Sequence, residues 1–138
     1  MTVLPHTILL DAHALSSLAD EARSLREWVA WAIRTGSPIH ISALTLAETT
    51  DGTSRDARIR RAAKALVIEP VTPAIGYSAG ALRAKAAKER RKPRDLTVDA
   101  VITATALALR PPVVVLTSDK PDLDLLLADS GVIVENLN

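Results

Sequence analysis

Two short runs of branched aliphatic residues, each followed by an acid, most constrain the fold of this 138-residue chain. Val113–Leu116 contains no polar residue, which is typical of a strand buried on both faces of a parallel sheet. Asp119 follows that run after two hydroxyl residues, and Ile8–Leu10 leads directly into Asp11. Two buried strands that each place an acid at the carboxyl end predict one shared acidic site.

Strand patterns alternate with helix patterns along the chain. The expected strands cover Thr7–Leu10, Pro38–Ser42, Val67–Val71, Val113–Leu116 and Val132–Glu135. The expected helices cover Ala12–Ala19, Asp20–Arg34, Ala43–Thr50, Arg55–Leu66, Pro73–Arg91 and Thr97–Leu109, followed by a short acidic helix. This alternation predicts an α/β fold, with a parallel sheet of four to five strands flanked by helices. Because no linker or repeat interrupts it, we expect 1–138 to form a single domain.

The composition excludes several classes of protein. The chain has no cysteine, so it has neither disulfides nor thiolate metal sites. No signal peptide is visible, and the longest apolar run, Ala100–Leu109, is too short to span a membrane, so we expect a cytoplasmic protein. Only Trp28, Trp31 and Tyr77 are aromatic, which leaves few platforms for stacking bases. Any nucleic acid would have to be bound mainly through charge and shape.

The charges are distributed unevenly along the chain. The segment from Arg55 to Arg94 holds 12 of the 17 basic residues and only three of the 16 acids. The rest of the chain is correspondingly acidic. A basic middle segment could draw a polyanion toward a cation held by the acids. Within that segment, Lys92 and Arg94 are closest in sequence to Asp99, so we expect them to contact substrate phosphates.

Each acid near an expected strand or helix end also has a purely structural explanation. Asp11 could cap the helix that follows it. Glu48 lies three residues after Thr45, which is the spacing of a capping box. Asp99 lies in the first turn of a helix whose expected cap is Thr97, where the helix dipole stabilises an acid. None of these acids indicates catalysis by itself.

Asp119 and Asp122 flank Pro121 at another expected helix start. One of the two acids could be a cap, but their spacing of three also lets both face one pocket. Carboxylates gathered without a counter-charge repel one another, and a hard divalent cation removes that conflict. A set of oxygen ligands without Cys or a neighbouring His favours Mg²⁺ or Mn²⁺ over Zn²⁺. Such an ion suits the activation of water for attack on a phosphodiester.

Four segments of the sequence carry a resemblance to a known family. They read LLDAHAL, LTLAET, LTVDAVITATAL and VLTSDKPDL in this order, with AGAL (Ala79–Leu82) between the second and third. The chain resembles PIN-domain ribonucleases over nearly its whole length, and is most similar to bacterial toxins of the VapC type. The resemblance implies a metal-dependent endoribonuclease that cleaves RNA. It also implies a homodimer, and an antitoxin whose tail occupies the active-site groove.

The resemblance also implies roles for individual residues. The acids that match the catalytic and metal-binding positions are Asp11, Glu48, Asp99 and Asp119, with Asp122 as a frequent additional metal ligand. Thr117 matches a hydroxyl residue just before the last acid, and would orient a ligand or water. His13 departs from the family pattern, which usually has a small residue two positions after the first acid. We favour a structural role for His13, because an isolated histidine is weak support for catalysis.

Two other functions remain compatible with the residues. The chain could be a phosphohydrolase that acts through an aspartyl intermediate, with Asp11 as nucleophile and Lys120 as the cation. It could also be a non-catalytic module that binds nucleic acid or protein, in which the acids are only caps. The second alternative predicts that Mg²⁺ and Mn²⁺ do not stabilise the protein.

Overall fold

A computed structural model describes residues 5–89 and 95–137 of the chain. Its centre is a five-stranded parallel sheet, which confirms the predicted α/β fold. The strands are β1 (Thr7–Leu10), β2 (Ile39–Ser42), β3 (Val67–Glu69), β4 (Val113–Thr117) and β5 (Ile133–Asn136). The helices are α1 (Ala12–Ala19), α2 (Arg23–Thr35), α3 (Ala43–Thr49), α4 (Asp56–Ala63), α5 (Pro73–Ala87), α6 (Thr97–Ala108) and α7 (Lys120–Leu126).

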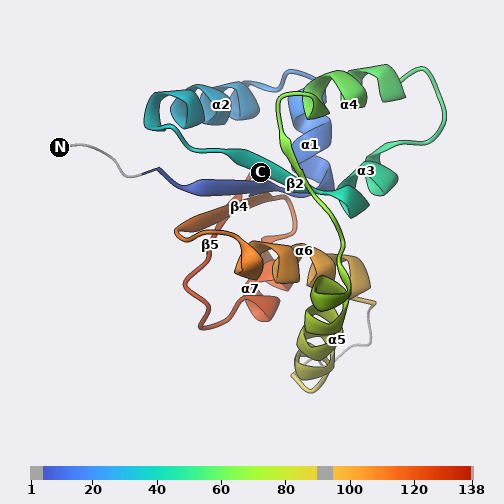
Figure 1. Ribbon diagram of the computed structural model, residues 1–138, viewed down its shortest axis with the longest axis vertical. Helices are drawn as coiled ribbons and strands as arrows, with labels where there is room; N and C mark the ends of the chain where they lie inside the picture. The colour runs from blue at the N-terminus through green and yellow to red at the C-terminus, as the bar shows by residue number, and fades with distance from the viewer. Residues whose placement is uncertain (1–4, 90–94, 138) are drawn as a thin grey trace.

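The strand order is β3-β2-β1-β4-β5. The chain therefore builds outward from β1 to β3, returns to the middle, and places β4 on the other side of β1 (Figure 1). Leu10 is in register with Leu116, and the backbone N–H of Asp11 donates to the Leu116 carbonyl at 3.2 Å. The carboxyl ends of β1 and β4 thus lie side by side where the strand order reverses, which is where open α/β sheets bind ligands.

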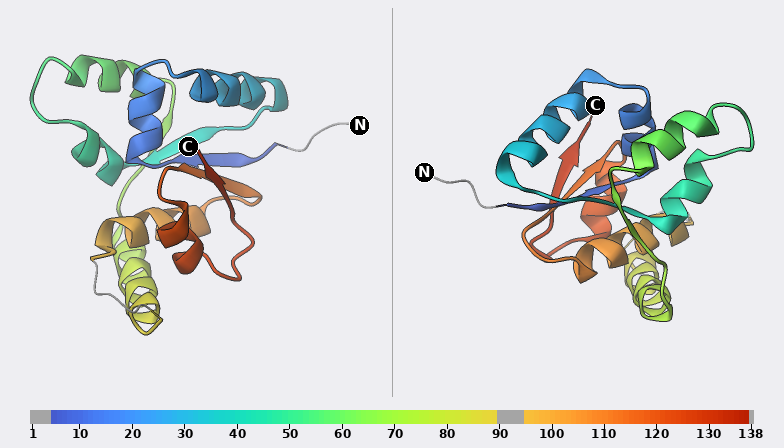
Figure 2. Two further views of the ribbon diagram at one scale, coloured as in Figure 1. Left: turned by 180° about the vertical axis from the view of Figure 1, so that it is seen from behind. Right: turned by 45° about the horizontal axis from the view of Figure 1, so that its top comes forward.

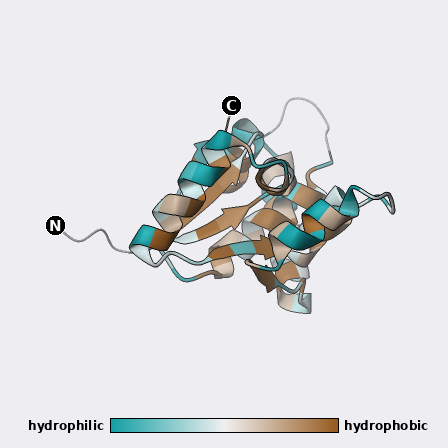
Figure 3. Ribbon diagram, turned by 90° about the horizontal axis from the view of Figure 1, so that it is seen from above, coloured by the Kyte–Doolittle hydropathy of each residue, from teal (hydrophilic) through white to brown (hydrophobic). Residues whose placement is uncertain are grey.

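Helices cover both faces of the sheet in two layers. In Figures 1 and 2, α1, α2 and α4 lie on one side of the strands, and α5, α6 and α7 lie on the other. Alternate β1 residues pack against opposite helical layers. Ile8 and Leu10 pack with α1 and α2, while Leu9 packs with α6 and α7. β4 is buried along its whole length, as predicted for Val113–Leu116. Figure 3 shows the resulting apolar strands inside more hydrophilic outer helices.

Local backbone chemistry sets the ends of α2, which differ from those predicted. α2 begins at Arg23 rather than Asp20, because Glu21 has a φ of 58° that no right-handed helix accommodates. It ends at Gly36, whose φ of 67° forms a left-handed C-cap. The predicted helix Pro73–Arg91 is observed as far as Ala87, and its last two residues lie outside the described part. Among the helices described, none has both the length and the apolar character needed to cross a membrane.

Candidate metal centre

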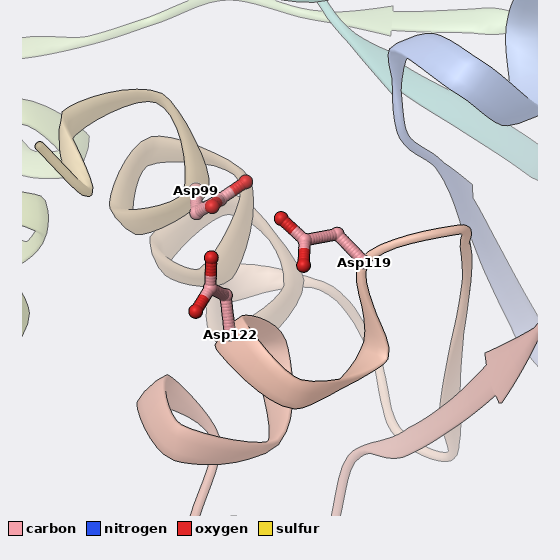
Figure 4. A group of neighbouring side chains, drawn as sticks. All are labelled: Asp99, Asp119 and Asp122. Atoms are coloured by element: carbon pink, nitrogen blue, oxygen red, sulfur yellow. The ribbon is translucent and has the colours of Figure 1, made fainter. Parts of the chain in front are cut away.

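Three aspartates converge beyond the carboxyl ends of β1 and β4. Asp99, Asp119 and Asp122 each offer a carboxylate oxygen, and these oxygens all lie within 4.8 Å of one another. Figure 4 shows Asp99 reaching from α6 toward the two acids at the start of α7. Asp122 is buried, whereas Asp99 and Asp119 are half-buried. The carboxylates of Asp119 and Asp122 therefore lie close together, as their spacing of three allows.

The end of β4 fixes the position of Asp119. Thr117 is fully buried, and its hydroxyl accepts a hydrogen bond from the backbone N–H of Asp119 at 2.8 Å. Asp119 occupies the N-cap position of α7, but its side chain makes no capping hydrogen bond. Thr117 was expected to orient a ligand or water. In the structure its hydroxyl orients the backbone of Asp119, whose carboxylate is turned toward Asp99 (Figure 4).

Asp99 lies in the first turn of α6, as the sequence predicted, but the cap of that helix is different. The N-cap residue is Leu96, and Thr97 is the first residue of the helix. Asp95 accepts hydrogen bonds from the backbone N–H of Thr97 at 2.9 Å and from its hydroxyl at 2.5 Å. These two bonds lower the pKa of Asp95. The expectation that Thr97 caps the helix is wrong because its hydroxyl is held by Asp95.

Asp11 has the structural role that the sequence left open. It is the N-cap of α1, and one of its carboxylate oxygens accepts a hydrogen bond from the Ala14 backbone N–H at 2.8 Å. Asp11 lies next to the end of β4, because its backbone N–H donates to the Leu116 carbonyl and so extends the hydrogen bonds between β1 and β4 by one residue. A cap needs only one carboxylate oxygen, so this role is compatible with a second role at the acid cluster.

Glu48 lies near the end of α3, whereas the other predicted acids belong to α6 or to the starts of α1 and α7. Partial desolvation raises the pKa of Glu48, and the negative charges of Asp99 and Asp11 raise it further. Two of the other predicted acids, Asp99 and Asp11, are therefore electrostatic neighbours of Glu48. The capping-box explanation for Glu48 is wrong, because Ser42 caps α3 through the Leu44 N–H at 3.1 Å and Thr45 lies inside the helix.

The donor set of the cluster suits a hard divalent cation. The three grouped ligands are all carboxylate oxygens, and the chain contains no cysteine. Oxygens on opposite sides of an octahedral Mg²⁺ lie about 4 Å apart, so small side-chain rotations would bring these three around one ion. An ion would also relieve the mutual repulsion that raises the pKa of Glu48.

The structure separates the remaining predicted residues from this cluster or leaves them untested. Lys92 and Arg94 lie outside the described residues. His13 is exposed in the first turn of α1. Lys120 forms an ion pair with Asp124 at 2.8 Å, so it is turned along α7 rather than offered to an aspartyl nucleophile. This pairing gives the phosphohydrolase alternative no support.

A groove away from the acids was not predicted. It has a volume of about 1000 Å³ and lies between α2 and α4. Its lining includes Val29, Ile33, Ala62 and Leu66, with Arg58 and Arg61. Ile33 is 77% exposed, although it continues the apolar pattern of α2. An apolar position at the end of a helical stripe is the sequence signal that could have indicated this groove.

Comparisons with known proteins give a family match and several structural matches. A family model described as PIN domain matches residues 8–121. The structure is similar to a chain of VapBC2 from Rickettsia felis bound to a promoter DNA fragment, with a TM-score of 0.75, 15% identity, and coverage of 96% of this chain and 99% of that chain. No curated protein sequence matches the chain significantly.

Two further solved structures show the same likeness. A chain of the DNA-bound VapBC complex from Salmonella typhimurium matches with a TM-score of 0.68 and 18% identity, over 97% of this chain and 98% of that chain. A chain of a toxin–antitoxin complex from Klebsiella pneumoniae matches with a TM-score of 0.66 and 23% identity, over 92% and 96% respectively. At these identities the matches establish the fold.

Proposed function

Because this chain belongs to the PIN domain family, we propose that it is a metal-dependent endoribonuclease and the toxin of a toxin–antitoxin pair. The observation that carries the proposal is the convergence of Asp99, Asp119 and Asp122 within 4.8 Å at the carboxyl ends of the central strands. The fold likeness to chains of VapBC complexes supports the assignment to a toxin.

In the proposed mechanism, Asp99, Asp119 and Asp122 hold Mg²⁺ or Mn²⁺. The ion would supply an activated water and stabilise the charge that develops on the scissile phosphate. Thr117 keeps Asp119 in place through its backbone N–H. Glu48 interacts electrostatically with Asp99 and Asp11, so we assign to its carboxylate the role of proton acceptor at this site. Asp11 adds a negative charge to the site while it caps α1.

The RNA substrate follows from the family resemblance, and the surface of the described residues is compatible with it. α4 presents Arg58, Arg60 and Arg61 to solvent. Tyr77 is 83% exposed, whereas both tryptophans are half-buried and pack edge to face. Binding would therefore depend on phosphate contacts more than on base stacking. Lys92 and Arg94 remain proposed phosphate contacts.

We propose that an antitoxin covers the groove between α2 and α4. The matched structures from Salmonella typhimurium and Klebsiella pneumoniae are complexes of this kind. The apolar lining of the groove suits the apolar face of a partner helix. Charges of both signs lie beside that lining, with Arg58 paired to Asp20 at 3.5 Å. The antitoxin tail would extend to the acid cluster, as the resemblance implies. The expected homodimer also remains a proposal, which sedimentation of the isolated chain would test.

Cleavage of a mixed cellular RNA pool tests the proposed activity. The wild type is compared with Asp99→Asn in Mg²⁺, in Mn²⁺ and with chelator, and Asp124→Asn serves as a control because Asp124 is exposed and pairs with Lys120. Cleavage that requires metal and is lost only in Asp99→Asn supports the nuclease. Equal cleavage by all three proteins would reject the site, and a protein that neither cuts nor binds metal would favour the non-catalytic module.

A further inference from the structure

Two threonine hydroxyls near the acid cluster have no hydrogen-bond partner in the described part of the chain. They belong to Thr45 in α3 and Thr103 in α6, and both residues are 0% exposed. Buried polar groups in folded proteins are almost always hydrogen-bonded, to protein or to ordered water. These two unsatisfied hydroxyls therefore call for a specific explanation.

Two other threonines inside helices satisfy their hydroxyls within their own helix. Thr105 donates to the Val101 carbonyl at 2.8 Å, and Thr49 donates to the Thr45 carbonyl at 2.9 Å. Threonine in a helix can make this bond to the carbonyl four residues earlier. Thr45 and Thr103 make no such bond, so their hydroxyls remain available to a group outside their own helix.

Both hydroxyls lie one helical turn from a proposed catalytic acid. Thr45 precedes Glu48 by three residues, and Thr103 follows Asp99 by four, so each pair shares one face of its helix. Leu44, next to Thr45, packs against the apolar cluster of α5 and α6 that contains Ala79, Ala100 and Ala104. Each hydroxyl therefore lies one turn from its acid and beside the core.

We propose that Thr45 and Thr103 are positioning residues, each of which holds an ordered internal water that supports the acid one turn away, Glu48 for Thr45 and Asp99 for Thr103. A buried water typically makes about three hydrogen bonds, so it can satisfy one threonine hydroxyl and still support a carboxylate. Groups behind the metal ligands orient those ligands, and their loss typically weakens metal binding by about 10- to 100-fold. The inference rests on the proposed metal centre and adds two residues that would position its acids.

Valine and serine variants of the full-length protein test this role. Thr45→Val and Thr103→Val keep the branched shape but remove the hydroxyl, whereas Thr45→Ser and Thr103→Ser keep the hydroxyl. Thr105→Val is the matched control, because Thr105 is buried in the same helix but bonds its own backbone. We expect each valine variant at positions 45 and 103 to bind Mn²⁺ about tenfold more weakly in calorimetry. The serine variants and Thr105→Val should keep wild-type affinity.

The opposite result is equally clear. If both valine variants bind Mn²⁺ like the wild type and unfold at an equal or higher temperature, the hydroxyls are simply unsatisfied and the inference is wrong. Should the valine variants fail to fold, a high-resolution crystal structure of the wild type decides, since it must show a water within hydrogen-bond distance of each hydroxyl. A wild type that binds no Mn²⁺ would instead reject the proposed metal centre itself.

Discussion

Asp99 and Asp119 come from different helices, yet their carboxylate oxygens lie within 4.8 Å of each other. The fold produces this proximity because α6 leads into β4, and the turn after β4 brings the chain back beside the start of α6. Two carboxylates at this distance repel in the metal-free protein and become favourable once a cation lies between them. The predictions below follow from this arrangement and from its neighbours.

Asp99→Asn should remove the stabilisation of the protein by metal, because it takes one carboxylate from the group that Asp99 forms with Asp119 and Asp122. The upward shift in melting temperature with Mn²⁺ should disappear. Asp124→Asn, which breaks only the exposed pair with Lys120, should change stability by less than about 1 kcal/mol and keep the shift. A Mn²⁺ shift retained in Asp99→Asn would contradict the site.

Glu48 should give the metal-free protein a distinctive dependence on pH. Its pKa in the folded chain lies above the ordinary value of 4.5, so the folded state binds more protons than the unfolded state between these two values. The free energy of unfolding should therefore fall as the pH rises through that window. Glu48→Gln should remove this decrease and be more stable than the wild type at neutral pH. Chemical denaturation from pH 4 to 8 measures the difference, and identical pH profiles would contradict the shift.

Substitutions of Asp11 should separate its capping role from its charge. Asp11→Ala removes the acceptor for the Ala14 N–H and should cost about 1 kcal/mol of stability. Asp11→Ser restores a cap but not a carboxylate, so it should be nearly as stable as the wild type and still bind Mn²⁺ more weakly. Urea denaturation and Mn²⁺ titration of the same two proteins measure both effects. Full Mn²⁺ affinity in Asp11→Ser would limit Asp11 to a structural role.

Asp56 is a buried acid that should matter for folding alone. Its two carboxylate oxygens accept the backbone N–H groups of Asp51 at 3.0 Å and Gly52 at 2.9 Å, which closes the loop between α3 and α4. Asp56→Ala should therefore cost about 1–3 kcal/mol of stability. Its Mn²⁺ affinity should stay within twofold of the wild type at a temperature where both are folded. A large loss of affinity without a loss of stability would connect Asp56 to the metal centre.

A charged residue introduced into the groove between α2 and α4 should weaken antitoxin binding without changing the stability of the fold. Ile33 is 77% exposed, so Ile33→Asp should leave the melting temperature unchanged but abolish binding of the cognate antitoxin. Tyr77→Asp is the matched control, because Tyr77 is 83% exposed on α5 and does not line the groove. Calorimetric titration with the antitoxin measures both. Wild-type binding by Ile33→Asp would place the antitoxin elsewhere.

The sequence predicted the strands and most helix starts better than it predicted the residues that cap those helices. An uninterrupted run such as Val113–Leu116 has one stable environment, inside a sheet, and β4 is fully buried. The rule that carboxyl ends of parallel strands meet at one edge predicts that Asp11 and Asp119 lie together. Asp99 lies at the start of α6, so only the family resemblance indicated that it joins Asp119 and Asp122. The order of the strands was not predictable, because it depends on how the crossovers pack and not on any local pattern.

The errors at the caps of α3 and α6 have a common physical cause. Several hydroxyl or acidic residues stand near each of these two helix starts, and only the folded structure decides which of them bonds the free backbone N–H groups. Asp95 therefore bonds Thr97, and Ser42 rather than Thr45 caps α3. Thr45 lies inside α3 with an unsatisfied hydroxyl, which no sequence pattern indicates.

Anomalous diffraction from a crystal grown with Mn²⁺ tests the central claim most directly. The account predicts a manganese peak bounded by the carboxylates of Asp99, Asp119 and Asp122, with metal–oxygen distances of about 2 Å, and no such peak in crystals of Asp99→Asn. Wild-type crystals that show no manganese between these three residues, from protein that still cleaves RNA with Mn²⁺, would contradict it.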